Sequence, residues 1–194
     1  MTVTAPKDGA EMLALVRLAT EKNDGPWCVR WPRDAVPSDV PDLEEIASVE
    51  PHTWEILREG ADCAILAVGS MVLPALEAAD VLDAEGVKCT VVNCRFLKPY
   101  DRAVFNQVMR SHPIVLTVEE GQVVNGFGAF MAKELNELGL SHQPQMSAMG
   151  LPDSFIEHGA RKNLLADIGL DVEGIVARIQ TLVGVRSPSL META

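Results

Sequence analysis

Aromatic residues are scarce in this sequence, at 5% of 194 residues, and only one of them is a tyrosine. The three tryptophans, Trp27, Trp31 and Trp54, all lie in the first third of the chain. This uneven distribution indicates that the first third is built differently from the rest.

Positive charge is also scarce. Lys and Arg number 16 against 28 Asp and Glu, giving a formal net charge of −12, and the basic residues form no run. Nucleic-acid binding depends on clustered cations that neutralise phosphates, so we expect no nucleic acid as a partner. No apolar run reaches the length of a membrane span, and no signal-peptide pattern opens the chain, so we expect no membrane association.

The four cysteines show no Cys-x-x-Cys spacing, which argues against a zinc knuckle or a dithiol redox motif. Cys28, Cys63 and Cys89 fall inside strand-like runs, where buried free thiols are common, and Cys94 follows one. Free thiols indicate a reducing compartment, so we expect a cytoplasmic protein.

Apolar strand-like runs alternate with segments of helical periodicity along most of the chain. Such alternation predicts βαβ units and a mostly parallel sheet between two helical layers, the three-layer αβα form of an α/β fold. The expected strands lie at 2–5, 27–31, 62–68, 87–92, 114–118 and, more weakly, 145–149. The expected helices lie at 8–24, 71–84, 101–111, 126–138 and 171–183. A capping box at Asp8 predicts that Glu11 reaches back to the first turn.

Composition divides the chain into four parts. Residues 1–34 offer one helix and two short strands, and 35–52 have the proline-rich, acidic composition of a linker. Residues 53–184 carry the full α/β alternation, whereas 185–194 have no periodicity and are predicted to be a disordered tail.

Two adjacent carboxylates, Glu119 and Glu120, end the strand expected at 114–118. A glycine-containing loop and a helix opening at Gly126-Phe127-Gly128 follow them. Open α/β sheets place functional groups at the carboxyl ends of their strands. The residues alone are equally compatible with glutamates that only cap the loop. The glycines do not form a dinucleotide fingerprint, because the third position of G-x-G-x-x-G is Met131.

Two arginine-containing segments follow strands. In the first, Arg30 and Arg33 flank Trp31-Pro32, where a guanidinium can grip a phosphate or carboxylate with two parallel hydrogen bonds. Taken alone, the segment is also compatible with two surface arginines. In the second, Arg95 and Lys98 are expected to pair with nearby carboxylates in a structural role.

The turn-rich segment 150–159 contains Ser154, Glu157 and His158. These residue types can perform acid–base or hydrolytic chemistry, but no G-x-S-x-G elbow surrounds the serine, and a histidine that braces a loop is the commoner outcome. No group of histidines and carboxylates has metal-ligand spacing. We assign no role to the remaining histidines, His52, His112 and His142.

Taken in order, these segments resemble 1-deoxy-D-xylulose-5-phosphate synthase, a thiamin diphosphate enzyme of the transketolase superfamily. The segments that carry the resemblance are Gly25-Pro26 with Arg30-Trp31-Pro32-Arg33, 94–101 (CRFLKPYD), 117–120 (TVEE) with 126–128 (GFG), 150–159 (GLPDSFIEHG) and 169–171 (GLD). The resemblance covers only the C-terminal third of that enzyme. It implies a transketolase C-terminal domain preceded by a remnant of the pyrimidine-binding domain.

The resemblance also implies what this chain needs from elsewhere. The complete enzyme joins pyruvate to glyceraldehyde 3-phosphate, releases CO2 and uses thiamin diphosphate with Mg²⁺. The family carries its metal–diphosphate motif and its activating glutamate upstream of the region matched here. We therefore expect no thiamin diphosphate or metal binding and no activity from this chain alone. The expected partners are a second copy, in a homodimer, or a polypeptide that carries the cofactor-binding domain.

One substrate-binding residue carries over by resemblance: Arg33 occupies the place of the arginine that holds the phosphate of glyceraldehyde 3-phosphate. Two neighbours differ from the family, because Trp31 replaces a tyrosine and Asp34 replaces a glycine. We expect the Asp34 carboxylate to compete with a phosphate for Arg33. Two other functions stay open, a non-catalytic assembly or regulatory module and the C-terminal part of a 2-oxo acid dehydrogenase β subunit or another transketolase-like enzyme.

Overall fold

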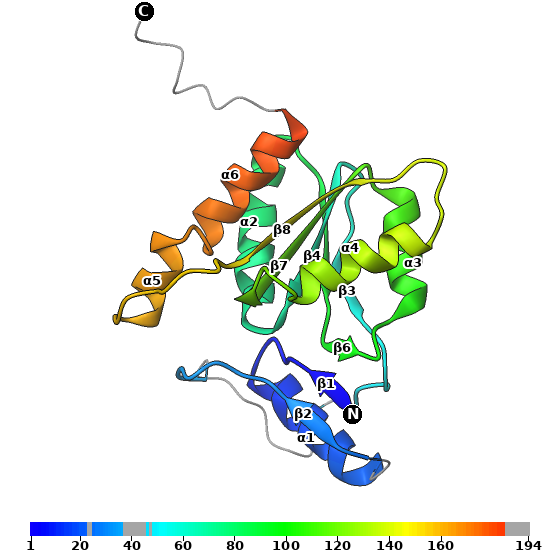
Figure 1. Cartoon of the computed structure of the whole chain (residues 1–194), viewed down its shortest axis with the longest axis vertical. Helices are drawn as coiled ribbons and strands as arrows, with labels where there is room; N and C mark the ends of the chain where they lie inside the picture. Colours follow the sequence, from blue (N-terminus) through cyan, green and yellow to red (C-terminus); the bar gives the residue numbers. More distant parts are fainter. Residues whose placement is uncertain (23–24, 37–45, 47, 185–194) are drawn as a thin grey trace, which may run out of the picture.

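The structure is a computed structural model that describes residues 1–22, 25–36, 46 and 48–184. Its centre is a five-stranded sheet with the strand order β3-β5-β4-β7-β8 (Figure 1). The strands are β3 (Glu55–Arg58), β4 (Cys63–Val68), β5 (Cys89–Asn93), β7 (Ile114–Gln122) and β8 (Gln145–Leu151). β4, β5, β7 and β8 run parallel, and the edge strand β3 pairs antiparallel with β5.

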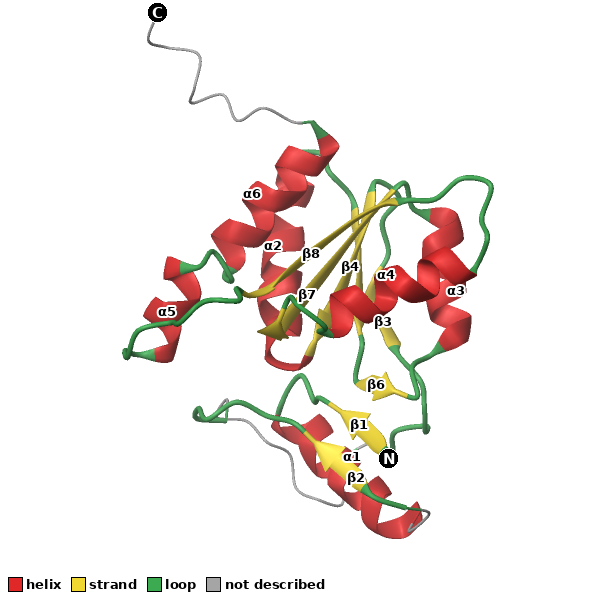
Figure 2. Cartoon of the chain, in the orientation of Figure 1, coloured by secondary structure: helices red, strands yellow, loops and turns green. Residues whose placement is uncertain are grey.

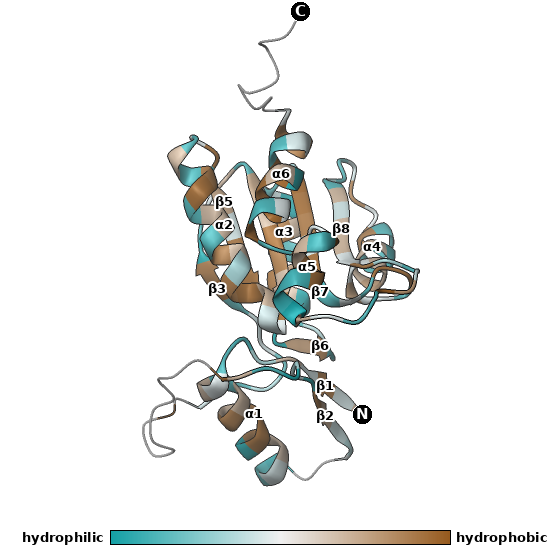
Figure 3. Cartoon of the chain, turned by 90° about the vertical axis from the view of Figure 1, so that its left-hand side faces the viewer, coloured by the Kyte–Doolittle hydropathy of each residue, from teal (hydrophilic) through white to brown (hydrophobic). Residues whose placement is uncertain are grey.

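Helices cover both faces of this sheet (Figure 2). Alternate residues of β4 point to opposite faces, so Ile65 packs with α2 (Val72–Ala84) and α6 (Val172–Val183). Leu66 packs instead with α3 (Arg102–Ser111) and α4 (Phe127–Glu137). All six residues of β4 are buried, and the strands form the hydrophobic centre of Figure 3. This arrangement confirms the predicted α/β fold with a mostly parallel sheet.

The first 29 residues attach to this body through a second, smaller sheet with the order β2-β1-β6. β1 (Thr2–Thr4) pairs parallel with β2 (Trp27–Val29) and antiparallel with β6 (Phe96–Lys98), and α1 (Gly9–Lys22) connects β1 to β2. β6 follows β5 of the large sheet, so the two sheets are joined within the chain. The carbonyl of Phe96 also accepts a 2.7 Å hydrogen bond from Trp54 Nε1.

Side-chain caps define several helix starts, and the sequence predicts the one at Asp8. Asp101 accepts hydrogen bonds from the amides of Ala103 and Val104 at the start of α3, each at 3.0 Å. Asp8 accepts from the Glu11 amide at 2.8 Å. Glu11 does not reach back to Asp8, however. Its carboxylate accepts from the Lys7 backbone amide at 2.7 Å and from the Asn93 side-chain amide at 2.8 Å.

Sequence analysis found the long elements and the two short strands β1 and β2. The strands β3 and β6 and the helix α5 (Arg161–Asp167) were not expected, and β7 and β8 extend further than predicted. The predicted tail at 185–194 and most of the predicted linker at 35–52 lie outside the described residues. Within the described part of the chain, no helix combines the length and apolar character that crossing a membrane requires.

Candidate functional site

Chemically active side chains gather at the carboxyl edge of β4 and β7, where the loop 30–36 lies against them. β4 ends at Val68, and Ser70 follows it in the short 3₁₀ helix η1 (Gly69–Met71). The neighbouring strand β7 carries the glutamate pair, with Val68 in register with Glu119. This edge is where open parallel sheets place their ligands.

Glu119 holds the glycine loop against the sheet. Its side chain is buried, at 3% exposure, and it accepts a 3.0 Å hydrogen bond from the Gly128 amide at the start of α4. A Cβ atom added to Gly126 would lie 2.0 Å from the Gln122 carbonyl oxygen, and one added to Gly128 would lie 2.4 Å from Thr117 Oγ1. These positions require glycine because the helix start approaches the strand so closely. The sequence left open whether this glutamate has a functional role or only caps the loop. Its contact with Gly128 is that of a residue that caps the loop.

Glu120 belongs to a different group, which we call the Arg161 cluster: Asp34, Ser70, Glu120 and Arg161. Arg161 Nε donates to Glu120 Oε1 at 2.8 Å, and its Nη2 donates to Oε2. Ser70 Oγ donates to the same Oε2 at 2.7 Å. Arg161 Nη1 donates in turn to Asp34 Oδ2 at 2.9 Å. The cluster thereby ties the loop 30–36 to β7, η1 and α5.

The charges of this cluster stabilise one another. Burial raises the pKa of Glu120, but hydrogen bonds from Arg161 and Ser70 outweigh it and hold the pKa below the ordinary 4.5. The Ala35 amide, followed by Arg161, lowers the pKa of Asp34. The hydrogen bond to Glu120 raises the pKa of Arg161. All three groups are ionised at neutral pH.

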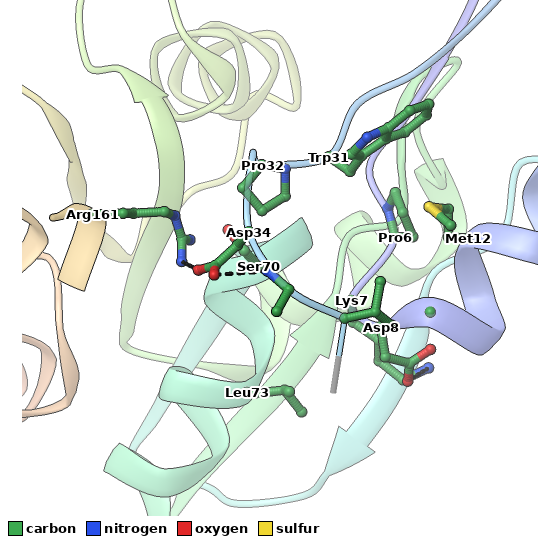
Figure 4. Close-up of a pocket in the computed structure, with 13 residues that line it drawn as sticks. Pro6, Lys7, Asp8, Met12, Trp31, Pro32, Asp34, Ser70, Leu73 and Arg161 are labelled. Atoms are coloured by element: carbon green, nitrogen blue, oxygen red, sulfur yellow. Dashed lines mark hydrogen bonds and ion pairs between the residues drawn. The ribbon is translucent and has the colours of Figure 1, made fainter. Parts of the chain in front are cut away.

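A pocket of about 230 Å³ lies beside the Arg161 cluster, between α1 and the loop 30–36 (Figure 4). Figure 4 shows the Arg161 side chain meeting Asp34 on one side of the pocket, with Trp31 and Met12 on the other. The lining is mixed, with Trp31, Met12 and Leu73 as apolar members and Lys7 as a cation. Trp31 is 60% exposed, so this indole contributes little to the core.

Arg33, the predicted substrate-binding residue, lies on the exposed loop 30–36 and is not among the residues that line this pocket. It makes no hydrogen bond or ion pair with any described residue. Asp34 does not point its carboxylate at Arg33 as expected: Oδ1 accepts from the Ala35 amide at 2.8 Å and Oδ2 from Arg161. The expected competition of Asp34 for Arg33 is therefore absent from the described contacts.

The other candidate residues remain apart or have structural roles. Ser154, Glu157 and His158 are exposed, and no hydrogen bond joins them within the described residues. Arg95 pairs with Glu11 at 3.5 Å and donates to the Thr53 carbonyl at 2.8 Å, which confirms the structural role predicted for it. Among the described residues, no group of three or more His, Cys, Asp or Glu side chains is placed to hold a metal ion.

Sequence reasoning missed Arg161. It lies in no recognised motif, α5 was not predicted, and its partner Asp34 is 127 residues away in the chain. The only available signal was the occurrence of an acidic residue, Asp34, where the resembled segment has glycine. Such a residue needs a new partner, but the sequence does not identify it.

Comparison with known families gives a consistent result. The family described as "Transketolase, C-terminal domain" matches residues 52–175. The 1-deoxy-D-xylulose-5-phosphate synthase of Geobacillus thermodenitrificans (strain NG80-2) is 39% identical over 186 residues, covering 94% of this chain and 29% of the relative. The 1-deoxy-D-xylulose-5-phosphate synthase 1 of Geobacter sulfurreducens is 38% identical over 193 residues, covering 98% of this chain and 30% of the relative. The chain thus spans less than a third of these relatives.

Solved structures show the same fold. A chain described as "Split gene transketolase, inactive beta4 tetramer" superposes with a TM-score of 0.83 at 34% identity, over 96% of this chain and 59% of that one. A transketolase variant from Pichia stipitis superposes with a TM-score of 0.69 at 21% identity, over 96% of this chain and 26% of that one. The second likeness supports the fold alone.

Proposed function

Because the chain belongs to the transketolase C-terminal domain family, we propose that it is the C-terminal part, or a split subunit, of a 1-deoxy-D-xylulose-5-phosphate synthase. The reaction would join pyruvate to glyceraldehyde 3-phosphate and release CO2. The observation that carries this proposal is the match to curated synthases over 94% of the chain, which extends beyond the family match into the N-terminal segment.

The synthase activity would need the part of the relatives that this chain does not contain. In the complete enzyme, thiamin diphosphate supplies an electron sink for the carbon that loses CO2. The described residues include no cluster suited to Mg²⁺, so they do not fit the metal–diphosphate group, and we assign no step through it to them. We propose that a polypeptide carrying the cofactor-binding domain is the partner, and that the assembly is dimeric. Because all four cysteines are free, a reducing compartment such as the cytoplasm suits the protein.

Arg33 is the residue of this chain that we assign to the substrate. Its guanidinium is exposed, and its neighbour Asp34 is engaged elsewhere, so it is available to an anion. A guanidinium offers a planar set of donors that matches two phosphate oxygens. In the assembled enzyme, Arg33 would hold the acceptor phosphate and orient the aldehyde.

A second candidate is a subunit of a split transketolase. The observation that favours it is the solved chain described as a split gene transketolase, which is 34% identical to this one. Its description as an "inactive beta4 tetramer" also gives a precedent for a chain that assembles without activity. The two candidates differ in the donor, which is pyruvate for the synthase and a ketose phosphate for transketolase.

The experiment is a chimera in which this chain replaces the matching C-terminal region of the Geobacillus synthase. Supplied with thiamin diphosphate and Mg²⁺, the chimera is expected to release CO2 from pyruvate and join the remaining carbons to glyceraldehyde 3-phosphate. This chain alone and the truncated relative alone are the matched controls. Because the cofactor-binding part of this chimera comes from a synthase, the chimera tests the first candidate. A folded chimera that is inactive with pyruvate and glyceraldehyde 3-phosphate would contradict it.

A further inference from the structure

Both carboxylate oxygens of Asp34 are occupied. Oδ1 accepts from the Ala35 amide at 2.8 Å, and Oδ2 accepts from Arg161 Nη1 at 2.9 Å (Figure 4). The Asp34 amide also donates to the Pro32 carbonyl at 3.1 Å, which makes a tight turn of the loop. The carboxylate is therefore directed toward α5 rather than toward the preceding residue, Arg33.

Arg161 is itself fixed by contacts on its other side. Its Nε and Nη2 bind the two oxygens of Glu120, and Ser70 donates to one of these oxygens. This paired contact fixes the plane of the guanidinium and leaves Nη1 for Asp34. A lysine at position 161 would lack this geometry, because an ammonium is a single charged point.

Arg33 is the cation adjacent to Asp34 in the chain, and it makes no ion pair with a described residue. The Asp34 side chain is 52% exposed, so once Arg161 is removed only the Ala35 amide still holds it. An unpaired carboxylate next to an unpaired guanidinium lowers the affinity of that guanidinium for any other anion.

We propose that Arg161 is a positioning residue that holds the Asp34 carboxylate away from Arg33 and so keeps the Arg33 guanidinium available to the acceptor phosphate. This inference rests on the proposed function for its substrate. Arg161 itself does not touch the acceptor.

The test measures how freely the Arg33 guanidinium reacts in the full chain, which requires no partner or substrate. Phenylglyoxal condenses with free guanidinium groups, and peptide mass spectrometry gives the rate at each arginine. Arg110, which is exposed on α3, serves as the internal reference. In Arg161→Ala, we expect the Arg33 rate to fall by about two- to fivefold, the range for an exposed ion pair.

Removing Asp34 as well separates positioning from a general effect. In Arg161→Ala with Asp34→Asn, the Arg33 rate is expected to return to the wild-type value. Lys162→Ala is the matched control, because it removes a cation from the next position of α5 and is expected to change nothing. Arg161→Gln, which still offers Glu120 a donor, replaces the alanine variant if that variant is unfolded.

The rates decide the inference whether or not the chimera is active. An unchanged Arg33 rate in the folded Arg161 variant, or a rate that stays low after Asp34→Asn, overturns it. In an active chimera, Arg161→Ala should raise the acceptor KM by a similar two- to fivefold without changing the pyruvate KM. Asp34→Asn should reverse that increase. Phosphorylated acceptor should protect Arg33 from phenylglyoxal in the active chimera. If it does not, Arg33 does not bind the acceptor phosphate. The rate comparison would still test whether Arg161 holds Asp34 away from Arg33.

Discussion

Glu11 of α1 and Asn93 of β5 lie 82 residues apart in the chain, and the Glu11 carboxylate accepts a 2.8 Å hydrogen bond from the side-chain amide of Asn93. Glu11 is only 5% exposed. The same carboxylate accepts from the Lys7 amide at 2.7 Å and pairs with Arg95 at 3.5 Å. One buried side chain therefore fastens the N-terminal helix to the end of a central strand.

Glu11→Ala should destabilise the whole protein. The substitution leaves the Asn93 amide and the Arg95 guanidinium without their buried acceptor, which should lower the free energy of unfolding by about 3 kcal/mol. Glu11→Gln keeps one acceptor oxygen and should cost less. Urea unfolding measures both. Glu21→Ala, on an exposed position of the same helix, is the control, and equal stability of Glu11→Ala and Glu21→Ala would contradict the prediction.

Acid should weaken the Arg161 cluster. The pKa of Glu120 is lowered in the folded protein, so its stabilising contribution is fully present above the ordinary value of 4.5 and is lost as pH falls through the lowered pKa. At pH 7, Glu120→Gln should cost about 1 kcal/mol. Between about pH 5 and pH 3, the stability advantage of the wild type over this variant should shrink.

Denaturant unfolding of the two proteins across this pH range measures the effect. Glu157→Gln is the matched control, because Glu157 is exposed and has no hydrogen-bond partner among the described residues. This variant should unfold like the wild type, because Glu157 makes no such contacts within the described part of the chain. A Glu120→Gln difference that is constant with pH would show that the ion pair with Arg161 contributes no stability.

Tyr100 gives an optical signal of its own, because it is the only tyrosine in the sequence. Burial and the hydrogen bond that its hydroxyl donates to Glu134 raise the pKa of Tyr100 to about 12. Absorbance at the tyrosinate band should therefore titrate well above the ordinary value of 10 in the folded protein. Glu134→Gln should lower the midpoint part of the way, since burial remains. The urea-unfolded chain gives the reference, and far-UV circular dichroism checks that the fold persists during the titration.

Arg33→Ala, tested in the chimera, should weaken the acceptor and leave pyruvate largely unaffected. A charge-assisted contact with two hydrogen bonds is worth about 1.5–3 kcal/mol, which corresponds to about a 10- to 150-fold increase in acceptor KM. Arg33→Lys should recover only part of the loss. Arg30→Ala, in the same loop, is the control. Equal increases in both KM values, or none, would return Arg33 to the role of a surface arginine.

The sequence predicted the body of the fold because the long elements carry a periodic apolar pattern. β4, with all six residues buried, and α3, with Phe105, Val108 and Met109 buried on one side, are such elements. The missed elements lack that signal. β3 and β6 are short strands with charged ends, and no residue of α5 is buried. These elements form through contacts with other parts of the fold, which a periodic pattern in the local sequence does not reveal.

The candidate site was predicted only in part, for the same reason. Resemblance drew attention to Arg33 and to the departure at Asp34, and the strand pattern placed Glu119 and Glu120 at a sheet edge. Glu119 accepts from the Gly128 amide at the start of α4, whereas Glu120 pairs with Arg161 of α5, a helix that the sequence did not predict. These contacts give the two glutamates different roles. The role of Arg161 is recognised only from the fold, in which Arg161 Nη1 lies 2.9 Å from Asp34 Oδ2.

The pairing of β1 with β6 determines how this protein can be recombined with others. A transplant limited to the family-matched residues 52–175 would carry β6 without its neighbouring strand. Phe96 is 0% exposed and its ring makes an edge contact with Trp27. The transplant would expose Phe96 and leave an unpaired apolar strand edge that is prone to association. We therefore expect a transplantable segment of this protein to start at β1, ahead of the residues that match the family.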